Sequence, residues 1–225
     1  MDETTIGSFV QLAERHLLPA LDLVSIDPGD PVRVLEAPEG FQLLGAGNYA
    51  AVFTHRDYSE LVIKVYAPGR GGWEDEREVY GRLGRHPAYS ACYAAGEKEG
   101  LRYLVLKRLR GKTMYQCMLD GEPIPESVIE DIDEALDYAR GRGLHPHDVH
   151  GKNVMVSGGK GLVVDVSDFL KTEPCMMWDD LKRAYERIYV PFMGNRPFPV
   201  PEWVMNGVRK GYRWIRQAAL DGRSS

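Results

Sequence analysis

The stretch His145–Asn153, HPHDVHGKN, is the densest polar cluster in the sequence. A helical pattern precedes it and an apolar strand pattern follows it, so we expect a loop at the edge of a strand, where functional residues collect. Asp148 precedes Asn153 by five residues, a spacing that lets one side chain orient a hydroxyl while the other binds a metal ion. Asp165 ends the next apolar run and supplies a second carboxylate.

Two segments nearer the N-terminus bear on the same chemistry. Gly45 and Gly47 lie between apolar runs, in a strand–turn–strand pattern whose backbone N–H groups can approach a nucleotide's phosphates while Val52 covers the base. Lys64 lies on the next predicted strand, and a buried ammonium needs a carboxylate partner. Glu76, beside the apolar stripe of the following helix, is the candidate partner. Taken singly, these residues also fit a plain glycine turn, a lysine that reaches solvent and a solvated helix face.

Together these motifs resemble the protein-kinase-like superfamily over about residues 41–188. The resemblance implies that Lys64 binds the α- and β-phosphates of ATP and that Glu76 holds Lys64. It also implies that Asp148 accepts or orients the acceptor hydroxyl, and that Asn153 and Asp165 bind Mg²⁺. The form Asp-Val-His-Gly-Lys-Asn is closer to small-molecule phosphotransferases and RIO-like kinases than to eukaryotic protein kinases.

The remaining nucleotide contacts follow from the same resemblance. Gly45, Gly47 and Val52 correspond to the glycine-rich loop and the residue above the base. Leu106 corresponds to the gatekeeper residue, and the backbone from Lys107 to Leu109 is expected to face adenine. The same residues also fit an ordinary strand of the hydrophobic core, because hinge residues pack against the core as well as bind nucleotide.

The sequence departs from the family pattern at several points. Ala50 replaces the third glycine of the glycine-rich loop, and Val166-Ser167 replaces the last two residues of the DFG motif, which argues against a DFG-type switch. No APE motif follows and the segment 168–180 is short, so we expect no long phosphorylated activation loop. Asp179 or Asp180 is expected to begin a helix, either buried beneath the catalytic loop or as a solvent-facing N-cap.

The predicted fold class is α+β, a bilobal protein-kinase-like fold. Residues 1–40 are predicted to form a helix, near Ile6–Leu23, and a loop. Residues 41–110 are predicted to form an N-lobe of five antiparallel strands and one helix, Trp73–Leu83. Residues 111–225 are predicted to form a reduced helical C-lobe, which contains a helix after Pro125, a hairpin around Ser157–Gly161, helices near Trp178–Tyr189 and Pro201–Ala219, and a proline-rich bend over Pro191–Pro201.

Composition excludes several classes of protein. The 225 residues are 44% hydrophobic and 27% charged with a net charge of -5, so the chain is globular and lacks the positive field of a non-specific nucleic-acid binder. No stretch approaches the roughly 20 apolar residues of a membrane span, and the N-terminus does not read as a secretory signal. Three separated cysteines match no disulfide framework. We therefore expect a cytoplasmic protein with no nucleic-acid or membrane partner.

The sequence thus predicts an ATP- and Mg²⁺-dependent phosphotransferase. A serine/threonine protein kinase is favoured, because only residues 111–225 follow the hinge and they leave an open cleft for a protein substrate. A sugar or drug kinase, which shares Asp148-Val149-His150, and an inactive pseudokinase that only binds remain alternatives. A zinc hydrolase is disfavoured because Asp148 directly follows His147, unlike the HxHxDH spacing. Gly111-Lys112-Thr113 lacks the first glycine of a Walker A loop.

Overall fold

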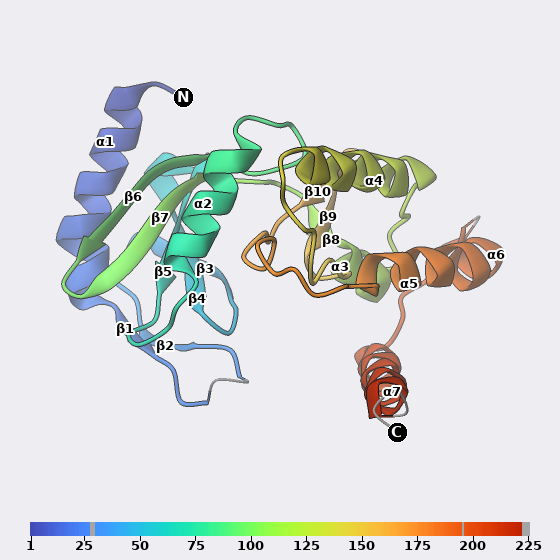
Figure 1. Ribbon diagram of the computed structural model, residues 1–225. Coiled ribbons are helices and arrows are strands. Elements are labelled where there is room, and N and C mark those ends of the chain that lie inside the picture. The colour runs from blue at the N-terminus through green and yellow to red at the C-terminus, as the bar shows by residue number, and fades with distance from the viewer. Residues whose placement is uncertain (28–29, 195, 222–225) are drawn as a thin grey trace.

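The computed structural model describes residues 1–27, 30–194 and 196–221, with side chains as far as Tyr212. A five-stranded antiparallel sheet forms the N-terminal half of the molecule (Figure 1). Its strands, in the spatial order β3-β4-β5-β7-β6, are β3 Phe41–Ala46, β4 Ala50–His55, β5 Leu61–Tyr66, β7 Leu101–Lys107 and β6 Cys92–Lys98. The predicted sheet and its strand number are confirmed.

Strand β5 is the middle strand, and its residues alternate between two covered faces of the sheet. Ile63 and Val65, both fully buried, belong to an apolar cluster that includes residues of the N-terminal helix. Val62 and Tyr66 belong to a second cluster on the opposite face, together with residues of helix α2, Trp73–Leu83. The alternation therefore places Lys64 on the face covered by α2.

The N-terminal segment covers the other face of the sheet. Helix α1, Glu3–Leu12, is capped by Asp2, which accepts the N–H of Thr5 at 2.7 Å, and the chain continues through a π-helical turn, Ala13–Leu17, and a 3₁₀ turn, Leu18–Ala20. The predicted helix is confirmed. The predicted loop is wrong in part, because two short antiparallel strands, β1 Asp22–Val24 and β2 Arg33–Glu36, form a hairpin there.

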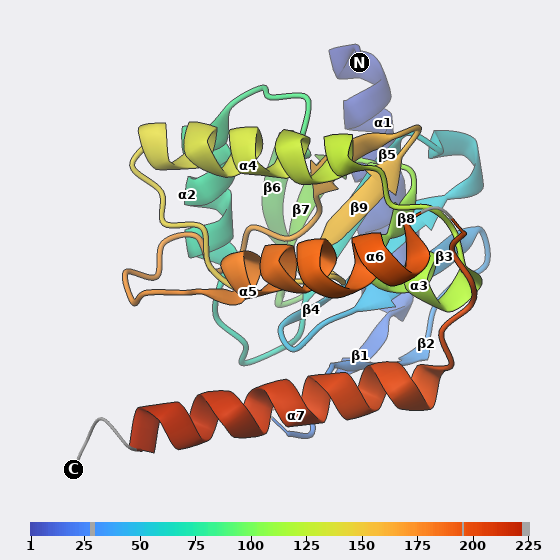
Figure 2. The same ribbon diagram turned by 90° about the vertical axis from the view of Figure 1, so that its right-hand side faces the viewer.

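The C-terminal half is mainly helical, and Figure 2 looks onto its helices. Helix α4 buries the predicted apolar stripe and packs against strand β10. The small sheet β10-β9-β8 contains the predicted hairpin. The elements are β8 Lys112–Thr113, α3 Met114–Asp120, α4 Glu126–Gly141, β9 Val154–Ser157, β10 Lys160–Val163, α5 Met177–Ala184, a π-helical turn Tyr185–Tyr189, α6 Val190–Met193 and α7 Glu202–Asp221. Over the described residues, no helix has both the length and the apolar character required to cross a membrane.

The proline-rich bend begins later than predicted. The N–H of Val190 donates to the carbonyl of Tyr185, five residues earlier, and the helix then continues through Pro191 as far as Met193. In an α-helix a proline ring crowds the carbonyl four residues earlier, and a π-helical turn changes that spacing. The turn before Pro191 therefore lets the helix continue where proline was expected to end it.

Candidate functional site

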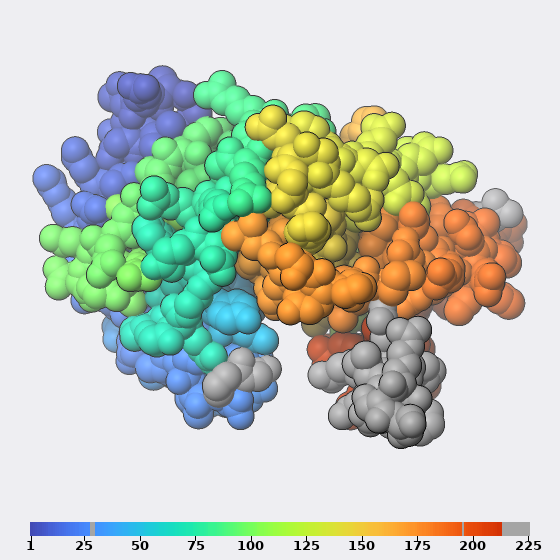
Figure 3. Space-filling model, viewed as in Figure 1, coloured from blue at the N-terminus to red at the C-terminus, as the bar shows by residue number. Residues whose placement is uncertain are grey.

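Lys64 lies between two carboxylates. Its Nζ is 2.8 and 2.6 Å from the two carboxylate oxygens of Glu76, and 3.5 Å from Oδ1 of Asp165. The side chain of Glu76 is 1% exposed, whereas that of Asp165 is 40% exposed. Strand β5, helix α2 and the segment after β10 thus bring together three of the predicted site residues. Figure 3 shows α2, in teal, beside the orange segment that follows Asp165.

Tyr66 belongs to this cluster, although the sequence analysis did not select it. Its hydroxyl donates to Oε2 of Glu76 at 2.5 Å, and its side chain is 2% exposed. The signal that would have found it is its position two residues after Lys64, since alternate residues of a strand share a face. Glu76 is therefore held by an ammonium and by a phenol hydroxyl.

Burial and charge pairing shift the pKa values of these groups in opposite directions. Burial alone would lower the pKa of Lys64, but the carboxylates of Asp165 and Glu76 raise it above its ordinary value. Burial alone would raise the pKa of Asp165, but Lys64 and the N–H of Ser167 hold it below the ordinary value. For Glu76, burial outweighs the attraction of Lys64 and raises the pKa. The ammonium of Lys64 therefore faces an ionised Asp165 on its more exposed side.

Asp148 has an unusual backbone conformation. Its φ of 57° lies in the left-handed region, which residues other than glycine seldom adopt. Its N–H donates to the sulfur of Cys175 at 3.4 Å, and its carbonyl accepts the side-chain N–H of Asn153 at 3.0 Å. Burial raises the pKa of its carboxyl, while His150, whose Nε2 is 3.7 Å away, acts in the opposite direction. Backbone strain of this kind is typical of active sites.

The amide of Asn153 is oriented by the same hydrogen bond. Because its Nδ2 donates to Asp148, its Oδ1 is the atom that could bind a cation. Its carbonyl accepts the N–H of Val164 at 2.9 Å, which places Asn153 beside the residue that precedes Asp165. Mg²⁺ prefers oxygen ligands, keeps several waters and uses one or two carboxylates of the protein. The donor set of Asn153 and Asp165 fits Mg²⁺.

The residues predicted to contact the nucleotide lie along the sheet. Gly45, in β3, and Gly47, in the turn before β4, are exposed. Val52 is partly buried and lies opposite Lys64 in the β4–β5 ladder. Leu106 is 5% exposed and lies opposite Val62 in the β5–β7 ladder.

Two backbone donors of the predicted hinge have partners within the protein. The N–H of Lys107 donates to the carbonyl of Ala91, and the N–H of Arg108 donates to the carbonyl of Glu60, both at 2.8 Å. These donors are used within the protein because the sheet pairing extends through Lys107. Lys107 and Arg108 thus have no N–H to offer adenine, and the carbonyl of Lys107 already accepts the hydroxyl of Ser90 at 2.7 Å. An adenine contact at Lys107, Arg108 or half-buried Leu109 stays a prediction.

The histidines of the loop His145–Asn153 do not converge on one point. His145 is exposed, His147 faces Asp168 with 3.9 Å between Nδ1 and Oδ2, and His150 faces Asp148. Among the residues that the structure describes, no three His, Cys, Asp or Glu side chains are grouped to hold a metal ion. The geometry gives the zinc-hydrolase alternative no support.

Neither aspartate at the start of α5 fulfils its predicted role. The side chains of Asp179 and Asp180 are 44% and 30% exposed, so neither is buried beneath the catalytic loop. The helix is preceded by Met176 at the N-cap position. The buried residue is Trp178, whose indole N–H donates to Asp133 at 2.7 Å and attaches α5 to α4.

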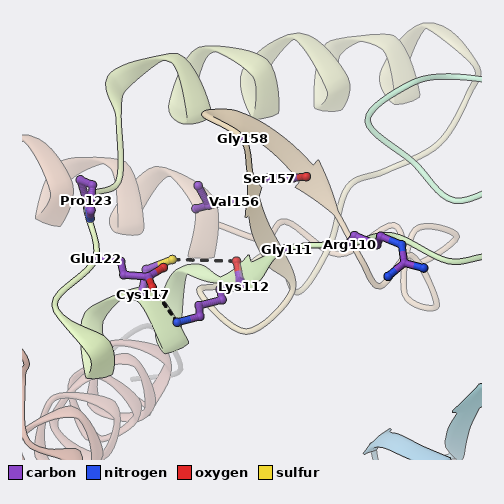
Figure 4. A pocket seen from close by; sticks show the side chains of 9 residues that line it. All are labelled: Arg110, Gly111, Lys112, Cys117, Glu122, Pro123, Val156, Ser157 and Gly158. Carbon is purple, nitrogen blue, oxygen red and sulfur yellow. Dashed lines mark hydrogen bonds and ion pairs between the residues drawn. The ribbon is translucent and has the colours of Figure 1, made fainter. Parts of the chain in front are cut away.

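A surface hollow of about 360 Å³ lies after the hinge (Figure 4), and none of the predicted catalytic or metal-binding residues lines it. One of its two cations, Arg110, is 2.6 Å from Glu60, and the other, Lys112, is 2.6 Å from Asp120 and 2.7 Å from Glu122. Because two carboxylates already neutralise this ammonium, the hollow has no unpaired charge at Lys112 to attract a phosphate.

Comparison with known proteins gives relatives of one kind. No family model matches the chain. The chain is 32% identical over 160 residues to the putative serine/threonine-protein kinase YrzF of Bacillus subtilis (strain 168), which covers 70% of this chain and 73% of that protein. It is 24% identical over 203 residues to testis-specific serine/threonine-protein kinase 3 of Mus musculus, with 80% of this chain and 72% of that protein covered.

Two solved structures are also similar. The kinase domain of Mycobacterium tuberculosis PknI, as its C20A mutant, matches with a TM-score of 0.44 and 22% identity, over 67% of this chain and 65% of that chain. Rad53 1-466 in complex with AMP-PNP matches with a TM-score of 0.48 and 17% identity, over 57% of this chain and 39% of that chain. The match spans less than two thirds of either solved chain.

Proposed function

Because the chain belongs to the protein-kinase-like superfamily, we propose that it is an ATP- and Mg²⁺-dependent phosphotransferase that phosphorylates a serine or threonine hydroxyl of a protein. The observation that supports this most directly is the position of Lys64 between Glu76 and Asp165. We take residues 41–110 as the N-lobe and residues 111–225 as the C-lobe, with residues 1–40 as an extension and ATP between the lobes.

The proposed mechanism assigns each group one task. Lys64, held by Glu76, binds the α- and β-phosphates. Asp148 accepts or orients the acceptor hydroxyl in line with the γ-phosphate. Mg²⁺ held by Asn153 and Asp165 would neutralise charge on the β- and γ-phosphates. Positioning and electrostatic stabilisation then supply most of the reduction in the barrier.

Two observations favour a protein as the acceptor. The relatives are named as serine/threonine-protein kinases, and the segment after the hinge is short. Only the two-residue strand β8, helix α3 of seven residues and helix α4 separate the hinge from the loop His145–Asn153. A protein hydroxyl can enter such a site from outside, whereas a small molecule gains more from an enclosed pocket.

The test uses purified protein with Mg²⁺, γ-labelled ATP and either generic protein substrates or a panel of sugars and aminoglycosides. We expect label on serine or threonine of a protein, and a loss of at least about 100-fold in Asp148→Asn and in Asp165→Asn. Both side chains are 39–40% exposed, so both variants are expected to fold. Asp137→Asn, which changes a carboxyl that is 75% exposed on α4, is the matched control.

Each alternative outcome is distinct. Label on a small molecule alone would contradict the protein acceptor but not phosphotransfer. Thermal stabilisation by ATP without any transfer would identify a binding module. Undiminished transfer in Asp165→Asn would contradict the assignment of the site.

A further inference from the structure

The hairpin of β1 and β2 is attached to the glycine-containing turn. The N–H of Val32, just before β2, donates to the carbonyl of Gly47 at 2.9 Å. Val32 is 3% exposed and belongs to the same apolar cluster as Ile63 and Val65 of β5. The attachment is therefore on the side of the sheet that α1 covers.

A second attachment is made by Arg70, in the connection between β5 and α2. Its Nε donates to the hydroxyl of Ser25 at 2.7 Å, and its Nη2 donates to the carbonyl of Asp27 at 2.8 Å. β5 carries Lys64 and α2 carries Glu76. One guanidinium thus connects the hairpin to the chain that links the two paired residues.

The bond from Val32 orients the peptide group after Gly47. The carbonyl and the N–H of a trans peptide group point in opposite directions, so the N–H of Asn48 is directed away from Val32. Val32 lies on the α1 side of the sheet, and Lys64 lies on the α2 side. The bond from Val32 thus sets the direction of the Asn48 N–H relative to the hairpin.

We propose that strands β1 and β2 form a strap that holds the glycine-containing turn in the orientation that binds phosphate, and that Arg70 is its positioning residue. The inference rests on the proposed function, because it concerns ATP. The N–H of Gly47 donates to the carbonyl of Ala50 and closes the turn, but its glycines leave the backbone some freedom, and ordering that backbone on binding would reduce affinity. The strap orders the turn before ATP binds and so reduces the cost of binding the phosphates. It does not contribute to the binding of adenine.

The experiment measures the affinity of the full chain for ATP and for adenosine by calorimetry. In Arg70→Ala we expect the affinity for ATP to fall about tenfold, within the usual range of coupling between sites, while the affinity for adenosine changes less than about twofold. Ser25→Ala, which removes one of the two acceptors without a change of charge, should show a smaller loss in the same direction. Arg33→Ala, on exposed β2, is the control and should bind both as the wild type does.

Arg70→Lys separates positioning from charge. Lysine keeps the charge but lacks the planar fork that reaches both acceptors, so we expect a partial loss of ATP affinity. Wild-type affinity in Arg70→Lys would assign the effect to charge and overturn the strap. Unchanged ATP affinity in Arg70→Ala, or equal losses for ATP and adenosine, would overturn it as well. A wild-type protein that binds no ATP would instead overturn the proposed function.

Discussion

Glu76 carries a carboxylate into the protein interior, where its side chain is 1% exposed. An isolated buried charge is expensive, so the structure must supply donors. Lys64 provides two contacts, and the hydroxyl of Tyr66 provides a third at 2.5 Å. Because Tyr66 and Lys64 belong to the same strand face, one strand supplies these donors and thereby sets the position of α2.

Tyr66→Phe should lower both the stability of the fold and the affinity of the proposed site for ATP. A buried hydrogen bond to a charged group is worth about 1.5–3 kcal/mol, and the variant loses one while it leaves the ring in place. We expect a lower melting temperature and a lower affinity for ATP, because Glu76 then holds Lys64 less firmly. Thermal denaturation with and without Mg²⁺–ATP measures both effects.

Tyr103→Phe is the matched control for this prediction. The hydroxyl of Tyr103 donates to Glu14 at 2.6 Å, on the face of the sheet that α1 covers. The variant Tyr103→Phe should lower the melting temperature without altering the affinity for ATP. Equal effects of the two variants on ATP binding would show that Tyr66 has no special relation to the site.

At the scale of elements, the sheet and α2 could be predicted because their patterns are strong and local. The run Leu61–Tyr66 is apolar except for Lys64, and Trp73–Leu83 combines helical spacing with glycine on both sides. The order of the motifs also predicted that Lys64 and Glu76 would meet. Asp165 joins them because the β9–β10 hairpin returns the chain to Asn153.

Other features depend on contacts that no local pattern reveals. Strands β1 and β2 flank turn-forming residues, and β2 is mostly exposed, so the sequence favoured a loop. Their positions are set by contacts with Gly47 and Arg70. The passage of a helix through Pro191 likewise depends on a π-helical turn, which sequence periodicity does not signal.

The junction of β10 with α4 allows a prediction at this scale. A Cβ on Gly161 would lie 2.5 Å from the carbonyl oxygen of Val128 and 3.0 Å from Ile132. Gly161→Ala should therefore separate hairpin and helix and destabilise the protein by about 1–3 kcal/mol in urea denaturation. Gly141→Ala, on the same helix with open space around its Cβ, should be neutral or stabilising by up to about 1 kcal/mol. Equal stability of the two variants would contradict close packing at this junction.

At the scale of the whole molecule, the N-terminal extension is part of the core. Phe9, Ala13 and Leu17 are each fully buried against the sheet. The centroid of the Phe9 ring is 5.2 Å from the centroid of the ring of Tyr58, which lies in the connection between β4 and β5. The sheet therefore has an apolar layer on each side, one built around α1 and the other around α2.

Phe9→Ala should destabilise the protein by about 3–5 kcal/mol, the usual cost of removing a buried aromatic side chain. We expect a single transition at a lower denaturant concentration, measured by circular dichroism. Gln11→Ala, on the exposed side of the same helix, should have little effect. A wild-type denaturation midpoint in Phe9→Ala would mean that α1 does not contribute to the stability of the sheet.

Strand β5 has hydrogen-bonded neighbours on both edges and apolar layers on both faces. Solvent can reach the main chain around Lys64 only when the entire sheet opens, because no fraying edge leads to it. Warming the protein should therefore not expose the main chain around Lys64 by degrees. The pairing of Lys64 with Glu76 should therefore persist until the sheet itself opens, and hydrogen exchange at the Lys64 amide should report that opening.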